Sequence, residues 1–163
     1  MAFDRHTIFG GTLVAVVLIT CLAGIAVTGG PGQARKEKED RARTAAMGET
    51  AVALACYYQA FGEIPEDLSV VEAELSKATS PAKQQSGCAT LEIQKDPISE
   101  EYFRLQRNAG DVTQICGDFA TANREGDDYR PFPSRYVVPD LNEPREAAGE
   151  HCYELNLSAK MEY

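Results

Sequence analysis

The sequence lacks the basic excess that binding to nucleic acid requires. Its 163 residues include 16 Lys and Arg against 25 Asp and Glu, which gives a net charge of −9. A protein that binds nucleic acid without regard to base sequence needs a basic surface to meet the phosphates. The composition therefore argues against a nucleic-acid partner. It favours instead a basic soluble partner, which an acidic surface would attract.

The sequence also lacks the patterns of common catalytic and cofactor sites. It has two histidines, of which only His151 lies beyond the N-terminal apolar part. A single histidine in this part of the chain is weak evidence for a Ser-His-Asp catalytic site. There is no Cys-x-x-Cys-His motif for haem, and no glycine-rich loop follows an expected strand. We therefore expect neither an enzyme nor a cofactor, and we interpret His151 as an exposed or structural residue.

Paired Cys-x-x-Cys motifs are absent as well, although four cysteines follow the apolar part. They are evenly numbered and widely spaced, which is typical of two disulfides in an oxidising compartment and unlike a zinc site. Three pairings are open, and we favour Cys56–Cys88 and Cys116–Cys152. The fifth, Cys21, lies inside the apolar run and is interpreted as a small apolar residue.

One long uncharged run, residues 8–28, stands near the N-terminus. Its 21 residues would reach about 30 Å as a helix, which is the thickness of the hydrocarbon core of a bilayer. We predict a single transmembrane helix whose anchoring side chains include Leu13, Val17, Leu18 and Leu22. The alternative is a cleaved signal peptide that has Arg5 in its basic region.

Two patterns in the sequence make opposite predictions about the orientation of this segment in the membrane. Five basic residues follow the run within 35–43 and only Arg5 precedes it, which favours a cytoplasmic domain. The cysteines favour an oxidising compartment, and we give them more weight. The predicted arrangement is a cytoplasmic N-terminus (1–7), a transmembrane helix (8–28), a charged, solvated stalk (29–43) and a domain (44–163) that is periplasmic or extracellular.

After the membrane segment, residues 33–61 have the pattern of one long helix. Its second part carries an apolar stripe at steps of four and three, and Gly62 follows as a C-terminal cap; the stripe is Met47, Ala51, Leu54, Tyr58 and Phe61. A short helix comes next, and the sequence from Ser69 to Glu72 fits a capping box at its start.

The rest of the chain has the pattern of short strands. Alternation predicts a strand over 89–94, a hairpin of 102–107 and 112–119 turning at 108–111, and a closing strand over 151–157. The predicted fold is α+β, with a long helix packed on a small antiparallel sheet and held by two disulfides. Residues 44–163 carry 10 basic and 21 acidic residues, a net charge of −11.

A long loop, 121–149, separates the hairpin from the closing strand. Aromatic residues and arginines alternate with prolines in its middle, and such side chains are favoured at binding surfaces; they are Tyr129, Arg130, Phe132, Arg135 and Tyr136. We predict a partner-binding surface here, the alternative being a loop that wraps its own domain. Asp127 and Asp128 are weak candidates for Ca²⁺, and a solvated acidic loop is the simpler interpretation.

Several short motifs occur in the order found in one known architecture. Gly62-Glu63-Ile64-Pro65 ends the long helix, Asp96-Pro97 precedes the hairpin, and two cysteine motifs follow, Cys116-Gly117-Asp118-Phe119 and Gly149-Glu150-His151-Cys152-Tyr153. With the apolar N-terminal helix, this arrangement resembles type IV pilins and pseudopilins. Gly10-Gly11-Thr12-Leu13 keeps part of a prepilin start, but Ala15 stands where those proteins have a glutamate that serves filament assembly.

The resemblance implies a pilin-like fold in a membrane-anchored domain. We expect a non-catalytic, single-pass accessory or structural subunit of a larger bacterial membrane complex, which docks through the membrane helix and loop 129–139. The alternative is a pseudopilin or minor pilin of a type II secretion or type IV pilus system. That alternative predicts cleavage after Gly10 or Gly11.

Overall fold

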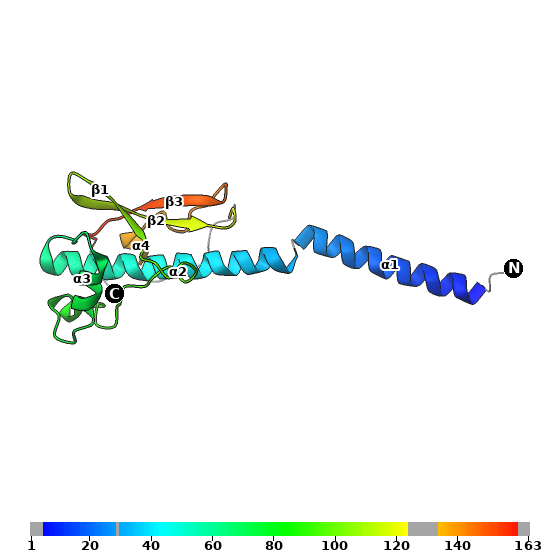
Figure 1. Cartoon of the computed structure of the whole chain (residues 1–163), viewed down its shortest axis with the longest axis horizontal. Helices are drawn as coiled ribbons and strands as arrows, with labels where there is room; N and C mark the ends of the chain where they lie inside the picture. Colours follow the sequence, from blue (N-terminus) through cyan, green and yellow to red (C-terminus); the bar gives the residue numbers. More distant parts are fainter. Residues whose placement is uncertain (1–4, 29, 124–133, 160–163) are drawn as a thin grey trace. The chain divides into compact units, whose positions relative to one another are not determined.

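The computed structural model describes residues 5–28, 30–123 and 134–159; within the first helix, the side chains of 5–9, 12, 22 and 25–28 are not described. The chain forms two units, Met1–Lys36 and Glu37–Tyr163, which are treated separately below. Along the chain the elements are α1 (Arg5–Thr28), α2 (Pro31–Phe61), α3 (Leu68–Leu75), the 3₁₀ helix η1 (Pro81–Gln84), β1 (Arg104–Asn108), β2 (Asp111–Phe119), α4 (Ser134–Val137) and β3 (Gly149–Glu154) (Figure 1).

Helix α1 covers the uncharged run, so the expected helix is present there. Large apolar side chains from Leu13 to Ile19 are each more than half exposed within the structure. Three of the four predicted anchor residues are among them, and the side chain of Leu22 lies outside the described residues. A transmembrane helix over 8–28 is nevertheless not supported, because none of the helices, searched over the described residues, combines the length and the apolar character that crossing a bilayer demands.

The bounds of α2 follow from its end residues. Pro31 stands at the first helical position, where its missing N–H costs nothing. Gly62 ends the helix with a φ of +82°, and its N–H donates to the carbonyl oxygen of Tyr58 at 2.7 Å. Only glycine adopts this left-handed conformation freely, so the predicted cap is confirmed.

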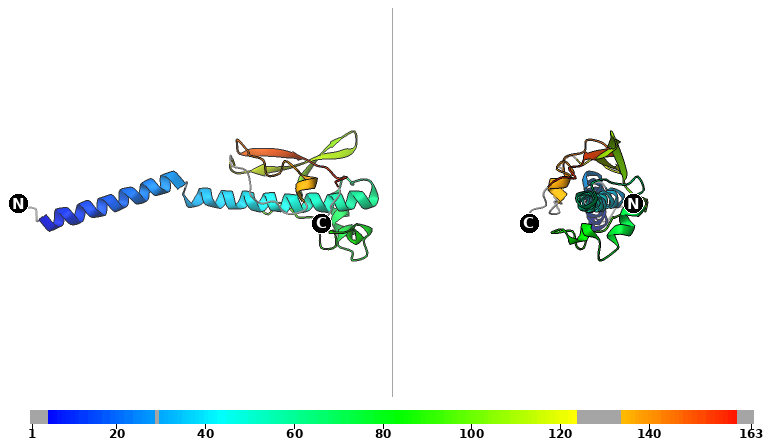
Figure 2. Two further views of the ribbon diagram at one scale, coloured as in Figure 1. Left: turned by 180° about the vertical axis from the view of Figure 1, so that it is seen from behind. Right: turned by 90° about the vertical axis from the view of Figure 1, so that its left-hand side faces the viewer.

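The burial of α2 differs from the prediction of a single apolar face. Every residue from Thr50 to Tyr57 is buried, whichever side of the helix it occupies. Figures 1 and 2 show the reason: the sheet lies along one side of α2 and the segment containing α3 lies along the other. A helix that is covered on both sides is apolar all round, and the small residues Ala51, Ala53 and Ala55 let both layers approach it closely.

The three strands form an antiparallel sheet in the order β1-β2-β3. β1 and β2 are joined by the tight turn Ala109-Gly110, where both residues have positive φ. Positive φ at both turn positions gives the twist that a two-residue hairpin needs. β3 pairs with β2 from Gln114↔Glu154 to Phe119↔Gly149. The predicted hairpin and closing strand are confirmed, although β3 ends at Glu154 instead of 157.

The predicted strand over 89–94 is wrong, although part of its alternation is correct. Ile93 is buried, whereas Thr90 and Glu92 are exposed. The backbone of this segment bonds to α2 instead of to a strand: the Thr50 hydroxyl donates to the carbonyl oxygen of Gln94 at 2.8 Å and accepts from its N–H at 3.0 Å. The Thr50 hydroxyl thus supplies the donor and the acceptor that a neighbouring strand would otherwise supply.

The start of α3 also differs from the prediction. Asp67 is the capping residue, and its side chain accepts from the N–H of Ser69 at 2.8 Å. Ser69 is therefore the second residue inside the helix and not its cap. Leu68, Val71 and Leu75 form the buried face of α3, as the helical spacing predicts.

The two outer strands have different surroundings. Beyond β3, the chain itself supplies partners: the carboxylate of Asp140 accepts from the N–H of Glu154 at 3.2 Å, and the carbonyl of Val137 accepts from the N–H of Asn156 at 2.8 Å. Beyond β1 the sheet opens on a cleft, which is described below.

Candidate functional site

Both favoured disulfides are present. Cys56 of α2 is joined to Cys88, and Cys116 of β2 is joined to Cys152, its direct neighbour in the register of β3. Cys56 and Cys88 are fully buried, while Cys152 is half-buried. Closing loops of 32 and 36 residues restricts the unfolded chain, which stabilises a domain with a small core.

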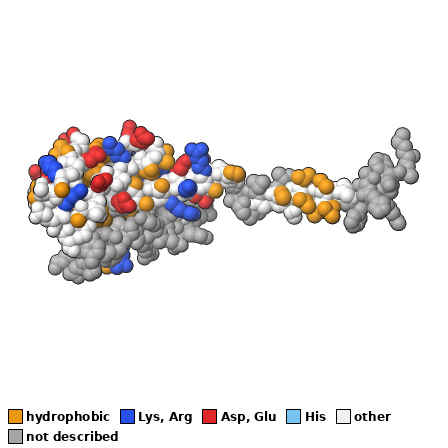
Figure 3. Space-filling view, turned by 90° about the horizontal axis from the view of Figure 1, so that it is seen from below, with side chains coloured by type: hydrophobic (Ala, Val, Ile, Leu, Met, Phe, Trp, Pro, Cys, Tyr) orange, Lys and Arg blue, Asp and Glu red, His pale blue; other side chains and the backbone are white. Residues whose placement is uncertain are grey.

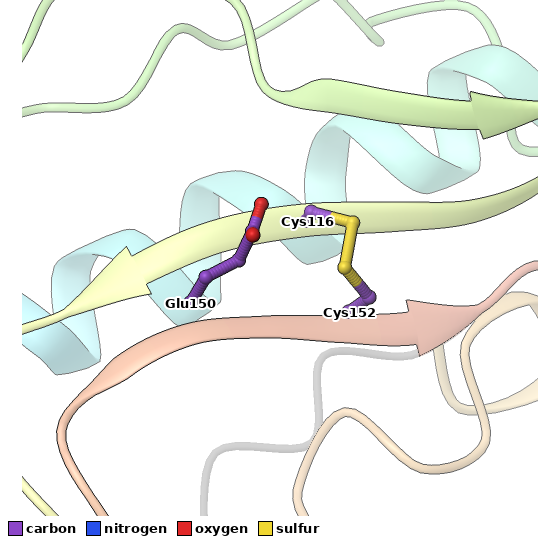
Figure 4. Close-up of side chains that lie close together, drawn as sticks. All are labelled: Cys116, Glu150 and Cys152. Atoms are coloured by element: carbon purple, nitrogen blue, oxygen red, sulfur yellow. A yellow bond between two sulfur atoms is a disulfide. The ribbon is translucent and has the colours of Figure 1, made fainter.

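The described residues bring one group of possible metal ligands together, Cys116, Glu150 and Cys152 (Figure 4). Both sulfurs are used by the disulfide, so neither is a thiolate that binds a metal. The carboxylate of Glu150 forms an ion pair with Arg104 of β1. The group therefore fastens the outer face of the sheet, and the calcium candidates Asp127 and Asp128 lie outside the described residues.

His151 has structural surroundings. One ring nitrogen lies 2.9 Å from the carbonyl oxygen of Ala147, and the ring meets Phe119 edge to face at 6.0 Å. No described hydroxyl or thiol is bonded to this imidazole, so within the described residues His151 does not form a pair of nucleophile and base.

Two of the five predicted partner-binding residues are described, and they form a pair. The guanidinium carbon of Arg135 lies 4.7 Å from the ring centroid of Tyr136, and a guanidinium N–H donates to the Tyr136 hydroxyl at 2.7 Å. Both side chains are exposed on α4. Tyr129, Arg130 and Phe132 lie outside the described residues, so the structure does not place them beside this pair.

A buried ionic cluster, absent from the sequence-based prediction, joins three segments. The Asp40 carboxylate accepts from the N–H groups of Ala120 and Thr121 at 2.9 and 2.8 Å, and from the Thr121 hydroxyl at 2.6 Å. Arg43 donates to Asp40 at 3.1 Å, and to both carboxylate oxygens of Asp96 at 2.5 and 3.2 Å. Asp40 and Arg43, expected in a solvated stalk, are thus buried.

The environment of Asp96 is unusual for an acid. Its burial opposes ionisation, but the hydrogen bonds from Arg43 and from the N–H groups of Ile98 and Ser99 outweigh that effect. The pKa of Asp96 therefore lies below its ordinary value. An acid held ionised in this way serves to fix the turn at Asp96-Pro97 and has no proton to give near neutral pH.

A second arginine is buried under the sheet. The guanidinium carbon of Arg145 lies 4.0 Å from the ring centroid of Phe119, and Arg43 approaches the same ring at 5.8 Å. Arg145 also donates to the Tyr153 hydroxyl at 3.2 Å, and its backbone pairs with Asn123. These contacts hold the two ends of the long loop 121–149 against the sheet.

A cleft of 270 Å³ opens at the outer edge of β1. One wall is the β1 side, and the other is the connection into α3; the lining residues are Glu66, Asp67, Leu68, Tyr102, Phe103, Arg104, Leu105 and Arg107. The Tyr102 hydroxyl donates to the carboxylate of Glu72, which raises the pKa of Tyr102 to about 12. Lys95 covers the Tyr102 ring at 4.7 Å from its centroid.

The sequence contains a signal for some of the clustered residues that were not predicted, and none for others. Asp96-Pro97 is visible as a motif before the hairpin, and a carboxylate beside a proline is typical of a turn. The pairing of Asp40 and Arg43 with Asp96 and Thr121 spans about 80 residues of chain and has no local signal.

Figure 3 shows that, on the face drawn, acidic and basic side chains are interspersed on the domain, while apolar ones gather on α1.

In the described ranges the geometry provides a cleft beside β1, the exposed Arg135–Tyr136 pair and buried structural clusters. Comparison with protein-family models, with curated proteins and with solved structures finds no match to this chain.

Proposed function

We propose that this protein is a non-catalytic accessory subunit of a larger bacterial membrane complex, with its acidic domain working in the periplasm. The observation that carries the proposal is the apolar surface of α1. Six large side chains between Leu13 and Ile19 are 51–65% exposed. An apolar surface of this kind is covered in the working protein by lipid or by other apolar helices. In the proposal, this helix is the contact to the complex.

The domain 37–163 supports an interaction role over a catalytic one. Its buried charges, Asp40, Arg43 and Asp96, are consumed in holding three segments of chain together. Its exposed Arg135–Tyr136 pair holds two side chains in one arrangement before a partner arrives, which reduces the entropy lost on binding. Loop 129–139, which includes this pair, is the proposed second contact to the complex.

The two disulfides support the oxidising compartment. Disulfides persist outside the cytoplasm and are rare inside it. The proposed location is the bacterial inner membrane with the domain in the periplasm, as the cysteines of the sequence indicate.

A pseudopilin or minor pilin is the second candidate function. Its support is the architecture: a long helix carries a small antiparallel sheet that is closed by a disulfide, which the sequence resemblance predicted. Ala15 replaces the glutamate that serves filament assembly in those proteins, so we rank this candidate below the accessory subunit.

The test is purification of the tagged full-length chain from native membranes in mild detergent, followed by intact-mass analysis without reductant. The accessory subunit predicts an uncut N-terminus, two disulfides and one co-purifying membrane complex. Loss of about ten N-terminal residues together with secretion or pilus proteins selects the pseudopilin. Four free thiols in the domain overturn the periplasmic location.

A parallel measurement addresses the role of α1. Membranes that contain the chain are extracted with alkaline carbonate, which releases peripheral proteins. Retention in the membrane pellet supports anchoring through α1, and complete release contradicts it. A chain in which Val17 and Leu18 are both replaced by Asp is the control, because two charges in this surface remove its apolar character.

A further inference from the structure

The two outer strands of the sheet differ in what lies beside them: at the end of β3 the chain's own groups accept from the N–H groups of Glu154 and Asn156, whereas a cleft lies beside β1. β2 is the only strand paired with β1 in the part of the chain that the structure describes, and the far side of β1 faces the cleft. We propose that this edge binds an extended, basic segment of a partner protein as an added fourth strand. The inference rests on the interaction role proposed above and names a contact that loop 129–139 does not provide.

The cleft has the form that strand addition requires. An edge strand presents unpaired N–H and carbonyl groups in a row, and an extended peptide pairs with them. Arg104 and Leu105 of β1, with residues 102 and 103 just before it, line one side of the cleft, and 66–68 form the facing wall. Arg107 marks one end of the site, because its guanidinium donates to the carbonyl oxygens of Ile64 and Pro65 at 2.9 and 2.7 Å and so joins the two walls.

The register of β1 also indicates that the binding site ends at Arg107. The pairing of β1 with β2 is shifted between Gln106 and Arg107, as in a β-bulge. A bulge ends regular pairing and twists the strand. The regular part of β1 therefore runs from Arg104 through Gln106, on the same side of Arg107 as residues 102–105. The added strand is short, and it pairs with this part.

The side chains that line the cleft indicate which residue types the added strand has at alternate positions. Leu68 and Leu105 supply apolar surface on the two walls. Because successive side chains of a strand point to opposite faces, every second residue of the incoming segment meets this surface and is apolar. The residues between them point away from it, toward solvent and the rim.

The charges around the cleft indicate which residues are favoured at the other positions of the bound segment, those that point toward solvent. The two arginines that line the cleft are engaged: Arg107 with backbone carbonyls, and Arg104 with the carboxylates of Asp118 and Glu150. Glu66 on the facing wall has no ion-pair partner among the described residues. Residues 62–75, which form that wall and α3, include five acidic residues and no basic one. The rim therefore favours lysine or arginine.

The same charge argues against a second copy of this chain as the occupant. Each copy carries a net charge of −9, so two copies repel at low salt. A basic partner segment is attracted under the same conditions. The proposed occupant is therefore a different protein, and the alternation of apolar and basic residues in an extended segment is its recognisable feature.

The experiment uses the purified full-length chain in mild detergent and a fluorescent eight-residue peptide of alternating lysine and valine. Fluorescence anisotropy measures binding, and amide hydrogen exchange locates it. We expect binding that weakens as salt is added, with slower exchange in residues 102–107 and unchanged exchange in β3. Glu66→Lys is expected to weaken binding by about fivefold at low salt, while the exposed control Glu143→Lys leaves it within twofold.

Two matched peptides separate strand addition from simple charge attraction. A lysine-valine peptide that is N-methylated at alternate residues keeps its charge but loses backbone donors, and it is expected to bind far more weakly. A glutamate-valine peptide is expected not to bind. Equal binding of the methylated peptide, or binding without protection of β1, overturns strand addition, and equal binding of the acidic peptide overturns the basic partner.

Failure of this proposal and failure of the proposed function are distinguishable. Peptide binding is measured without the membrane complex, and co-purification is measured without the peptide. If residues 102–107 become protected as the chain alone is concentrated, a second copy occupies the edge and the partner assignment is wrong. Absence of all peptide binding also overturns it, whatever complex co-purifies.

Discussion

Gly117 of β2 leaves room for Met47 of α2: a Cβ atom placed on Gly117 would stand 2.6 Å from Cε of Met47 and 3.5 Å from Cδ of Arg43. The sheet thus approaches α2 closely at the point where the core meets the ionic cluster. Met47 is fully buried, so it has little freedom to move aside.

The first prediction concerns this contact. Gly117→Val is expected to lower the free energy of unfolding by about 1–3 kcal/mol, because the added methyl groups overlap Met47. Met47→Ala alone opens a cavity and costs about 2–5 kcal/mol. The double variant is expected to lose less than the sum of the two, since each change relieves the other. Denaturant unfolding of the four chains measures this, and strict additivity would contradict the contact.

The second prediction concerns Asp40. Asp40→Asn keeps the shape of the side chain but removes the charge that holds Arg43 and the backbone after β2, and it is expected to cost about 2–4 kcal/mol. Asp118→Asn is the control, because Asp118 pairs with Arg104 on the exposed face. That change is expected to cost less than about 0.5 kcal/mol. Equal effects of the two substitutions would refute a structural role for the buried cluster.

The third prediction is a pH dependence. The pKa of Asp96 is lowered in the folded protein, so the unfolded state binds a proton more readily than the folded state does. The stabilisation is fully present above the unfolded value, about 3.9, and is lost as the pH falls through the folded value. Unfolding free energies measured from pH 3 to 7 are expected to fall steeply below pH 4, and less steeply in Asp96→Asn. Parallel curves for the two proteins would contradict the assignment.

The fourth prediction separates the disulfides. Replacing Cys56 and Cys88 by Ala is expected to cost about 3–4 kcal/mol from chain entropy, plus a further loss because both side chains lie in the core. Replacing Cys116 and Cys152 is expected to cost the entropic part and a smaller packing loss, because Cys116 is buried but Cys152 is only half-buried. Thermal unfolding under non-reducing conditions compares them, and a larger loss for the second pair would count against this ranking.

The fifth prediction concerns the proposed contact to the complex. Arg135→Ala combined with Tyr136→Ala is expected to reduce co-purification of the membrane complex by about tenfold or more while leaving unfolding unchanged, because both side chains are exposed. Lys77→Ala is the control, since this exposed lysine pairs with Glu74 and lies outside loop 129–139. Unchanged co-purification of the double variant would remove α4 from the proposed surface.

Local signals in the sequence were enough to predict much of the fold. Gly62 indicated where α2 ends, the four residues from Asn108 to Asp111 indicated the hairpin, and the cysteine pairing was predicted with them. These features depend on backbone conformation or on a few covalent possibilities, which neighbouring residues reveal. The helix over the apolar run was predicted for the same reason.

Long-range contacts decided the features that were predicted wrongly. Residues 89–94 alternate like a strand, but the Thr50 side chain bonds to the backbone of Gln94, and none of the described strands pairs with them. Asp40 and Arg43 sit in a charged stretch that looks solvated, yet Thr121 and Asp96 bury them. In each case the deciding partner is more than 40 residues away, and nothing near the residue identifies it.

Of the candidate site, the sequence indicated α4 through Arg135 and Tyr136 but not the cleft beside β1. The cleft depends on how the connection into α3 lies against the edge of the sheet, which composition does not specify. Its lining residues 102–107 are predicted to form a hairpin strand, and Glu66, Asp67 and Leu68 precede the predicted capping box, so the sequence predicts no surface that both groups share.

The unequal surroundings of the two outer strands affect where another strand can join the sheet. A continuous fibre of paired strands requires each unit to offer two open edges, one to accept and one to donate. Here the N–H groups of Glu154 and Asn156, at and just beyond the end of β3, are already bonded to Asp140 and Val137. A strand that approaches this end of β3 finds both donors taken, so the sheet is less suited to continuous stacking than to a single addition at β1.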